Sequence, residues 1–316
     1  MKILLYYLHF LACLFLVTAD GSCKANNNVV SMLEDAHAPL VAVTACTGEA
    51  GGRFLTALRQ VYPAKSIRCL VRKGTTKPLD HLNDLESLHE VDFMDSKSIS
   101  KAFKGAAAVY LNTPPSLDVL AMRENMAAAC SANAATIQHV VFLGEAVDIA
   151  WYGLSQYWDD HKAGEDAVQK TGLPVTVLHP AFFTEGFGTH FGNPQSIVEA
   201  DSFSRVGTAP VAYTSLADVG VVAAKILIEG PDIHGWKKYN LINEVVTGDQ
   251  VAVALTKALG RTITYKPITV DEFAAGMVAG GVPEVFVEGY KVAVQHTADA
   301  VSYTHLRAHE TKANLV

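Results

Sequence analysis

The hydrophobic positions of this chain form short runs that alternate with longer amphipathic stretches. Six runs rich in Val, Ile and Leu predict buried strands, at residues 40–44, 66–71, 89–92, 107–112, 139–143 and 174–178. Helical patterns predict four helices between them, at residues 52–61, 97–103, 117–133 and 159–170. Strands that are apolar on both faces and alternate with helices are typical of a parallel sheet covered on both sides. The pattern therefore predicts an α/β fold with a doubly wound parallel sheet.

The regular alternation ends after residue 180. The next stretch, 182–210, is rich in Gly, Phe and Thr and has no clean period, although a helix near 216–227 and a strand near 239–242 follow it. Two capping boxes, Thr247 with Gln250 and Thr269 with Glu272, predict the starts of two later helices. We therefore expect a core at residues 32–180 and a smaller C-terminal α/β lobe at 181–300, which carries the substrate cleft and is partly interleaved with the core.

Both ends of the chain carry segments that we do not expect to belong to the fold. Residues 3–19 are almost wholly apolar and end in small residues, as a secretory signal peptide does. The same segment fits an uncleaved membrane anchor, or an extraneous extension, residues 1–31, if translation begins at Met32. The location is therefore cytoplasmic for a start at Met32, and secretory or membrane-anchored if residues 1–19 act as a signal. The tail at 301–316 resembles a translated cloning linker.

Composition excludes several classes of protein. Half of the 316 residues are apolar and 18% are charged, which suits a globular core, and the formal net charge of −7 disfavours a nucleic-acid partner. The five cysteines are spaced singly, so we interpret them as reduced thiols. The histidines lack a helical metal-binding spacing, except for His305 and His309 in the tail, and no metal site is predicted.

A glycine-rich turn follows the first predicted strand. The segment from Ala45 to Gly52 reads ACTGEAGG and leads into a helix. In a dinucleotide-binding turn of the Rossmann type, Gly48 would let the backbone approach a pyrophosphate and Gly51 would let the helix pack closely on the strand. Ala45 stands where the first glycine is usual, which is tolerated only if its φ angle stays negative. A purely structural turn is the alternative interpretation.

The second predicted strand ends in a basic pair, Arg72 and Lys73. These residues come about twenty positions after the glycines, where an NAD-binding fold carries an acidic residue for the ribose. The guanidinium of Arg72 matches a 2′-phosphate instead, so the sequence favours NADP(H) as the cofactor, with NAD(H) as the second choice. A solvated strand end is the alternative interpretation.

A longer series of segments occurs in unbroken order between residues 40 and 294. They are VTACTGEAGG at 43–52, LVR at 70–72, VDF at 91–93, FKG at 103–105, VYLNTP at 109–114, HVVF at 139–142, KAGE at 162–165, GLP at 172–174 and HPAFF at 179–183. This series resembles the NmrA-like family of atypical short-chain dehydrogenases. The resemblance implies either an NAD(P)H-dependent reductase of quinones, azo dyes and related compounds, or a regulator that binds NADP without turning it over.

The resemblance also implies which residues hold the cofactor. The pyrophosphate loop comprises Thr44, Ala45, Thr47, Gly48, Glu49, Ala50 and Gly51. By the same resemblance, Arg72 and Lys73 bind the 2′-phosphate, and the adenine lies near Asp92 and Phe93. The nicotinamide half runs along Asn112, Thr113, Pro114 and Lys162, with Pro180, Phe182 and Phe183 over the ring.

The usual catalytic triad of short-chain dehydrogenases is absent. Its Tyr and Lys lie four residues apart on one helix face. Counting back from Lys162 reaches Trp158, whereas Tyr157 is one place off, roughly 100° around the helix. The usual Ser after the fifth strand is replaced by Gly144-Glu145. Lys162 and, with less support, Tyr157 remain the candidate catalytic residues.

For each of three further features, two interpretations remain open. Lys162 contacts the ribose or forms a helical ion pair with Glu165. His179, which stands where the family has Arg before Pro, is a satisfied buried histidine or a catalyst, and we favour the first. Four phenylalanines line an apolar substrate slot or fill the interface between the lobes: Phe182, Phe183, Phe187 and Phe191.

We therefore expect an NADP(H)-binding protein that reduces a flat, electron-poor small molecule, such as a quinone, by direct hydride transfer. That chemistry needs chiefly a positioned nicotinamide and an apolar slot, because water can supply the proton. The alternative is a non-catalytic sensor whose NADP(H) occupancy controls a protein partner, since the missing triad suits both. A membrane contact is expected only if the N-terminal segment is retained as an anchor.

Overall fold

The computed structural model describes residues 38–298, apart from residues 78, 80, 81, 115, 146–150 and 190–192. Within these residues, no helix combines the length and the apolar character that crossing a bilayer requires. Several sequence predictions lie outside the described residues: those for 1–31 and 301–316, for Cys13 and Cys23, for Phe191, and for His305 and His309.

The main sheet has seven strands in the order β10-β6-β5-β4-β1-β2-β3, and every adjacent pair is parallel. The strands are β1 (Val41–Thr44), β2 (Ile67–Arg72), β3 (Ser87–Val91), β4 (Ala108–Leu111), β5 (His139–Leu143), β6 (Val175–Pro180) and β10 (Lys238–Leu241). The chain winds outward from β1 to β3, returns to β4 and winds outward again. The predicted doubly wound Rossmann sheet is therefore confirmed, with its switch point between β1 and β4.

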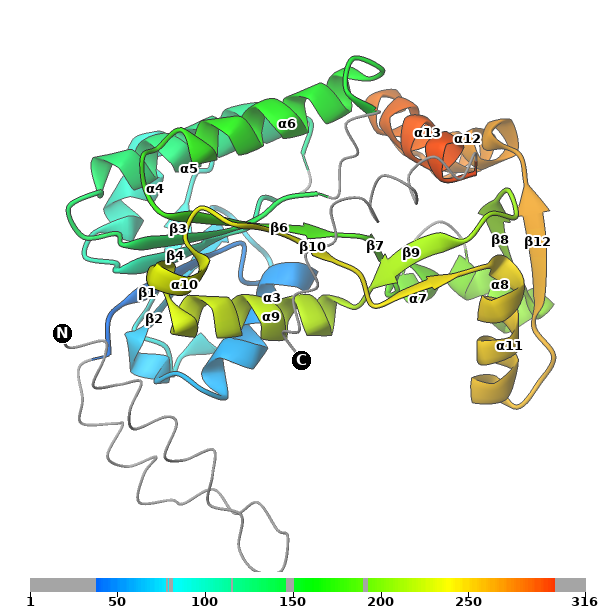
Figure 1. Cartoon of the computed structure of the whole chain (residues 1–316), viewed down its shortest axis with the longest axis horizontal. Helices are drawn as coiled ribbons and strands as arrows, with labels where there is room; N and C mark the ends of the chain where they lie inside the picture. Colours follow the sequence, from blue (N-terminus) through cyan, green and yellow to red (C-terminus); the bar gives the residue numbers. More distant parts are fainter. Residues whose placement is uncertain are drawn as a thin grey trace, which may run out of the picture.

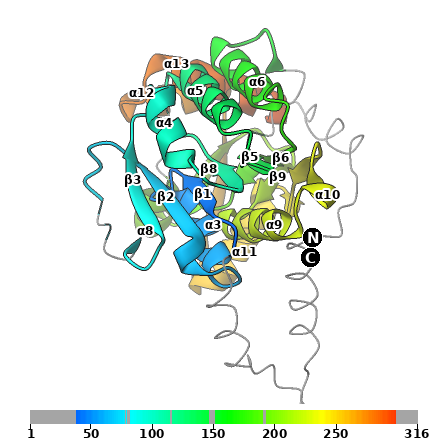
Figure 2. The same ribbon diagram turned by 90° about the vertical axis from the view of Figure 1, so that its left-hand side faces the viewer.

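Helices cover both faces of this sheet (Figures 1 and 2). One face carries α4 (Ser96–Phe103), α5 (Val119–Ala132) and α6 (Gln156–Gln169), and the other carries α3 (Glu49–Arg59), α9 (Leu216–Glu229) and the short α10 (Pro231–His234). Side chains alternate along each strand, so Ala42 enters one core, whereas Val41 and Val43 enter the other. The five inner strands are mostly buried on both faces, which is why their sequences read as apolar runs, whereas the edge strands β3 and β10 are partly exposed.

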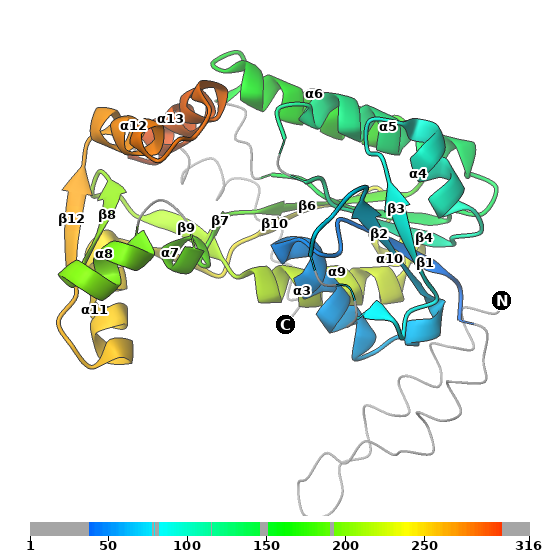
Figure 3. The ribbon, with the colours of Figure 1, turned by 180° about the vertical axis from the view of Figure 1, so that it is seen from behind.

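A second lobe lies beyond the carboxyl ends of the main strands (Figure 3). It holds two small sheets, built from β7 (Phe182–Phe183), β9 (Val211–Thr214) and β11 (Glu244–Val246), and from β8 (Ser202–Val206) and β12 (Thr264–Ile268). Its helices are α7 (Gly186–Thr189), α8 (Asn193–Ala200), α11 (Gly248–Leu259), α12 (Val270–Ala279) and α13 (Glu284–Ala298). Both predicted capping boxes form, at the starts of α11 and α12.

The C-terminal part of the chain also returns to the main sheet. Strand β10 pairs with β6, and helix α9 packs against α3 on the sheet surface, although both elements follow residue 180. Helix α13, near the end of the described chain, lies beside the first turns of α6. This return places residues from three distant segments around the carboxyl ends of β4 and β5.

Candidate functional site

The glycine loop between β1 and α3 forms a tight turn. The Ala45 carbonyl accepts a hydrogen bond from the Gly48 backbone N–H at 2.9 Å, and a Cβ added at Gly51 would overlap that same carbonyl. Ala45 has a φ of +48°, so the expectation that its φ stays negative is wrong. The turn closes in the left-handed region, which costs an alanine roughly 1–2 kcal/mol. The geometry therefore explains why residue 51 is glycine. It also shows that Ala45 has a strained backbone conformation at a position where glycine is usual.

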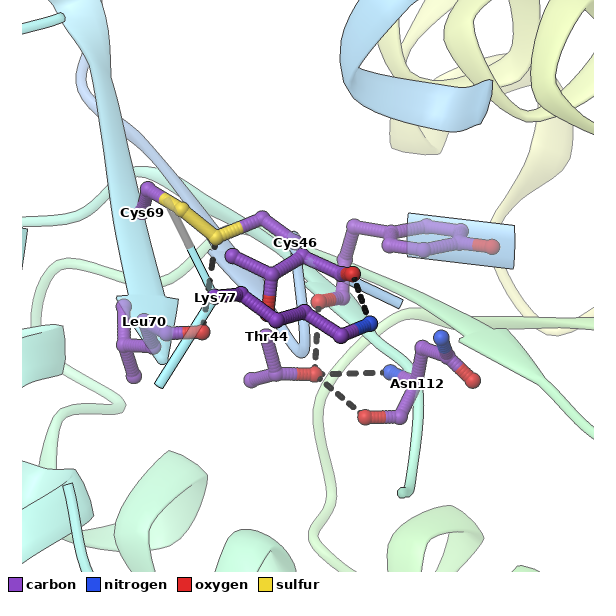
Figure 4. The surroundings of a disulfide bond; sticks show 8 residues. Thr44, Cys46, Cys69, Leu70, Lys77 and Asn112 are labelled. Carbon is purple, nitrogen blue, oxygen red and sulfur yellow. Dashed lines mark hydrogen bonds between the residues drawn. A yellow bond between two sulfur atoms is a disulfide. The ribbon is translucent and has the colours of Figure 1, made fainter. Parts of the chain in front are cut away.

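The start of α3 presents unused hydrogen-bond donors at this loop. Its N-cap residue, Gly48, makes no side-chain cap, so the first backbone N–H groups of an eleven-residue helix have no capping acceptor. The Lys77 side chain donates to the Thr47 carbonyl at 2.6 Å and brings a positive charge to the loop (Figure 4). Free N–H groups and a nearby cation fit a pyrophosphate. Lys77 was not among the predicted cofactor-binding residues, because it belongs to the loop after β2.

Thr44 and Asn112 join the ends of β1 and β4 (Figure 4). The Thr44 hydroxyl accepts from the Asn112 N–H at 2.7 Å and lies 2.8 Å from the Asn112 carbonyl, to which it donates. Thr44 is fully buried. Its side chain therefore fixes the backbone of Asn112, the first residue of the predicted nicotinamide segment.

A disulfide links Cys46 in the glycine loop to Cys69 on β2, with Cα atoms 6.0 Å apart (Figure 4). The interpretation of all cysteines as reduced thiols is therefore wrong for this pair. Parallel pairing of β1 with β2 brings the two residues together despite a separation of 23 in sequence. Cys130 is a free thiol, and burial raises its pKa to about 12.

The predicted adenosine side of the site is partly exposed. Arg72 ends β2 with its side chain in solvent, and the following Lys73 N–H donates to the Val91 carbonyl at 2.9 Å. Within the described chain, no ion pair involves the Arg72 guanidinium. Asp92 is exposed, whereas Phe93 is 2% exposed and packs in the core, and its carbonyl accepts a hydrogen bond from the Asn125 side chain at 3.2 Å.

Lys162 has a different ion-pair partner from the one proposed. Its ammonium pairs with Asp166, one turn along α6, and lies 5.9 Å from the centre of the Tyr152 ring. The alternative interpretation, an ion pair with Glu165, is wrong, because Glu165 pairs with His179 and Lys238 instead. A contact between Lys162 and the ribose stays a prediction.

Glu165 instead holds His179 and Lys238. Its carboxylate oxygens lie 2.7 Å from the His179 Nε2 and 2.7 Å from the Lys238 Nζ. Burial alone would raise the pKa of Glu165, but His179 and Lys238 outweigh it and lower the pKa to about 2. Gly144 makes room for the pair, since a Cβ there would lie 3.1 Å from the His179 ring. His179 therefore has the hydrogen-bond partner that the first interpretation requires, although its side chain is half-buried rather than buried, and its role stays a prediction.

A second buried network surrounds Glu145, the residue that replaces the usual serine. Arg123, on α5, is 1% exposed, and its Nη2 lies 2.7 and 2.9 Å from the two Glu145 oxygens. Arg123 also donates from Nε to the Thr113 hydroxyl at 3.2 Å and from Nη1 to the His161 carbonyl at 2.9 Å. Gly164 leaves room for it, because a Cβ there would lie 2.5 Å from the Arg123 Cδ.

His161 completes this network from α6. Its Nδ1 lies 2.9 Å from Glu145 Oε2, an ion-pair distance, although its N–H is not aligned for a hydrogen bond. Burial raises the pKa of Glu145, but the charges of Arg123 and His161 overcome that effect and lower it to about 2. The network was not predicted from the sequence, because its three side chains come from separate elements.

Helix α6 begins at Gln156 rather than at residue 159, so Tyr157 and His161 both lie in its first turns. Their ring centres are 4.5 Å apart. The spacing of four matches that of the usual Tyr–Lys pair, with His161 in the place of lysine. The four-residue spacing between Tyr157 and His161 is the sequence signal that predicts this pair.

The phenylalanines do not form one slot. Phe182 packs with Trp151 and Trp158, Phe183 packs on the main core, and Phe187 packs against Phe203 in the second lobe. The three described phenylalanines therefore fill three separate clusters. This arrangement supports the interface interpretation.

Comparisons with known proteins place this geometry in a family. The NmrA-like family model matches residues 38–312. Quinone oxidoreductase 2 from Escherichia coli (strain K12) is 24% identical over 248 residues, which cover 78% of this chain and 83% of that protein.

Solved structures agree with that match. The triphenylmethane reductase of Citrobacter sp., complexed with NADP(H), has a TM-score of 0.70 and 27% identity, and the match covers 87% of this chain and 93% of that one. NmrA, a negative transcriptional regulator, has a TM-score of 0.65 at 19% identity, with coverage of 83% and 84%, and supports the fold alone. The predicted resemblance is confirmed, and this chain belongs to the NmrA-like family.

Proposed function

We propose that this protein is an NADP(H)-dependent reductase of flat, electron-poor small molecules of the quinone or cationic dye class. One observation carries the proposal: an uncapped helix N-terminus and the exposed guanidinium of Arg72 lie at the ends of the adjacent strands β1 and β2. Together they match a pyrophosphate and a 2′-phosphate on one ligand. The predicted cofactor agrees with the NADP(H) held by the triphenylmethane reductase.

The residues of this chain divide the work of reduction. When bound, NADPH supplies a hydride. The glycine loop and Lys77 hold the phosphates, Arg72 selects the phosphorylated ribose, and Thr44 fixes the segment at Asn112–Pro114 beside the predicted nicotinamide. Orientation is the main contribution that such a reaction asks of the protein.

Anaerobic NADPH consumption by the full chain tests the proposal. The acceptors are a panel of quinones and a cationic triphenylmethane dye, with NADPH binding measured separately by fluorescence. We expect turnover with at least one acceptor and a loss of binding in the Arg72→Ala variant. Tight NADPH binding without turnover of any acceptor contradicts the proposal.

A non-catalytic sensor is the second candidate function. The absence of the Ser-Tyr-Lys triad is compatible with both functions, but Glu145 at the serine position has its carboxylate occupied by Arg123, which suits a protein without turnover. Capture of protein partners with and without NADP⁺ tests this candidate. A sensor would show a partner whose retention depends on NADP⁺, together with tight cofactor binding and no turnover.

A further inference from the structure

Five polar side chains converge where β5 ends, apart from the predicted phosphate and ribose contacts. Glu145 follows β5, Arg123 comes from α5, Tyr157 and His161 come from α6, and Tyr290 comes from α13. Arg123 bridges Glu145 to α6, and the Glu145 charge raises the pKa values of both tyrosines, after the larger effect of burial. Three elements distant in sequence thus place an imidazole, a carboxylate and two phenols together.

This cluster adjoins the predicted nicotinamide segment. The Arg123 Nε donates to the Thr113 hydroxyl at 3.2 Å, and Thr113 follows β4, the strand next to β5. The carboxyl ends of neighbouring parallel strands meet at the same edge, where α/β folds bind their ligands. Glu145 itself keeps a third of its side chain exposed, so the cluster is not sealed in the core.

His161 is the member suited to donate a proton. Its side chain is 7% exposed, and its Nδ1 lies 2.9 Å from the Glu145 carboxylate, so the ring is placed directly beside an acidic group. Arg123 holds Glu145 in place and competes for the same carboxylate. The two phenols remain protonated at neutral pH, because burial raises the pKa values of Tyr157 and Tyr290.

We propose that His161, held by Glu145, donates the proton that accompanies hydride transfer to a quinone-like substrate, and that Arg123 is a positioning residue. This proposal rests on the proposed function. It assigns the role of the missing Tyr-Lys pair to a Tyr-x-x-x-His arrangement on the same helix.

The step balances in atoms and electrons. The hydride carries two electrons and one hydrogen to the quinone, and the imidazolium transfers its Nε2 proton to the oxygen on which negative charge develops. The products are a hydroquinone, NADP⁺ and neutral His161, which takes a proton from water. A positioned acid of this kind contributes about 10²–10⁴-fold beyond what water supplies.

A cationic triphenylmethane dye provides the matched substrate. Its central carbon accepts a hydride and becomes neutral, so its reduction needs no proton. Loss of an acid should therefore slow quinone reduction and spare dye reduction. A loss of orientation or of cofactor binding should slow both.

The experiment compares His161→Gln with His234→Gln in the full chain. His234 is a matched control, because it is buried, lies 2.7 Å from Glu229, and belongs to α10 at the opposite edge of the sheet. We expect His161→Gln to lower the rate of quinone reduction by about 100-fold and to leave dye reduction and NADPH affinity within about twofold. His234→Gln should leave the ratio of the two rates unchanged.

The pH profile of the wild-type protein gives a second readout that needs no variant. Quinone reduction should fall as the pH rises, because an acid can donate only while it is protonated, whereas dye reduction should lack that limb. Glu145, Arg123 and Tyr157 face His161, and Tyr290 packs against Tyr157. Burial raises the pKa values of both tyrosines.

Each other outcome overturns the proposal. Equal losses with both acceptors make His161 a structural residue, and an unchanged quinone rate means that water is the donor. If His161→Gln does not fold, identical pH profiles for the two acceptors reject the assignment. A wild-type protein that reduces neither acceptor overturns the proposed function, and this proposal falls with it.

Discussion

The two halves of the sheet's carboxyl edge follow different rules. At β1 and β2 the chain keeps a dinucleotide-binding pattern, with an uncapped helix N-terminus and a basic residue at the next strand end. At β5 the usual serine of short-chain dehydrogenases is replaced, and Glu145, Arg123 and His161 form a partly exposed network instead. The cofactor half depends on backbone geometry, whereas the reaction half depends on side chains from separate elements.

This difference indicates how the site can change in evolution. A turn that presents backbone N–H groups constrains which residues can stand at adjacent positions, so it tolerates few replacements. A side-chain network needs only that its members meet, and it can be rebuilt from new residues while the fold persists. The cofactor is thus more readily inferred from the family than the reaction.

The largest expected effect concerns the reaction half. We expect Arg123→Met to lower the free energy of unfolding by about 3–5 kcal/mol, because it leaves the Glu145 carboxylate without its buried partner. The melting temperature should fall by roughly 10 °C. Chemical and thermal denaturation measure the change.

Arg59→Met is the control for Arg123→Met. Arg59 pairs with Asp84 at the surface, where both side chains are about a third or more exposed, so its loss should cost under about 1 kcal/mol. Equal losses in the two variants would mean that the Glu145 network is no more important than a surface pair.

The disulfide in the cofactor half gives the next effect. A bond between Cys46 and Cys69 closes a loop of 23 residues and should stabilise the fold by about 3 kcal/mol. We expect reductant to lower the melting temperature of the wild type by about 6–12 °C. A Cys46→Ala/Cys69→Ala double variant should no longer respond to reductant.

Cys130→Ala provides the matched control, since Cys130 is buried and unpaired. This variant should keep the response to reductant that the double variant loses. Two fully titratable thiols at Cys46 and Cys69 in unfolded, unreduced protein would contradict the disulfide.

The features that could be predicted from the sequence differ between the cofactor half and the reaction half in the same way. The five inner strands are mostly buried on both faces, so their positions were visible in short apolar runs, and Gly51 was visible because only glycine fits against the Ala45 carbonyl. The disulfide, Lys77 and the Arg123–Glu145–His161 network were not visible. Each depends on which elements become neighbours in space, and no local pattern encodes the meeting of α5, β5 and α6.

The exposed Arg72 tests the cofactor half directly. A charge-assisted contact with a 2′-phosphate is worth roughly 1.5–3 kcal/mol, so Arg72→Ala should weaken NADPH binding by about ten- to a hundredfold. NADH affinity should change little, because NADH lacks that phosphate. Fluorescence titration of both cofactors measures the difference. Equal losses for both cofactors would place Arg72 at the pyrophosphate or in loop stability, and the cofactor preference would need another residue.

The smallest expected effect concerns Ala45, which stands in the cofactor half at the position where a dinucleotide-binding turn usually has its first glycine. Glycine adopts a φ of +48° without the steric cost that alanine bears, but it loses more conformational entropy on folding. The balance predicts that Ala45→Gly raises the free energy of unfolding by about 0.5–1 kcal/mol. Ala57→Gly, within α3, should lower it by about 1 kcal/mol, because there the alanine is helical. If the backbone is left-handed at Ala45, urea denaturation should show a higher free energy of unfolding for Ala45→Gly and a lower one for Ala57→Gly. A loss in both would mean that the loop holds Ala45 at negative φ, and that the first position of the turn is not strained.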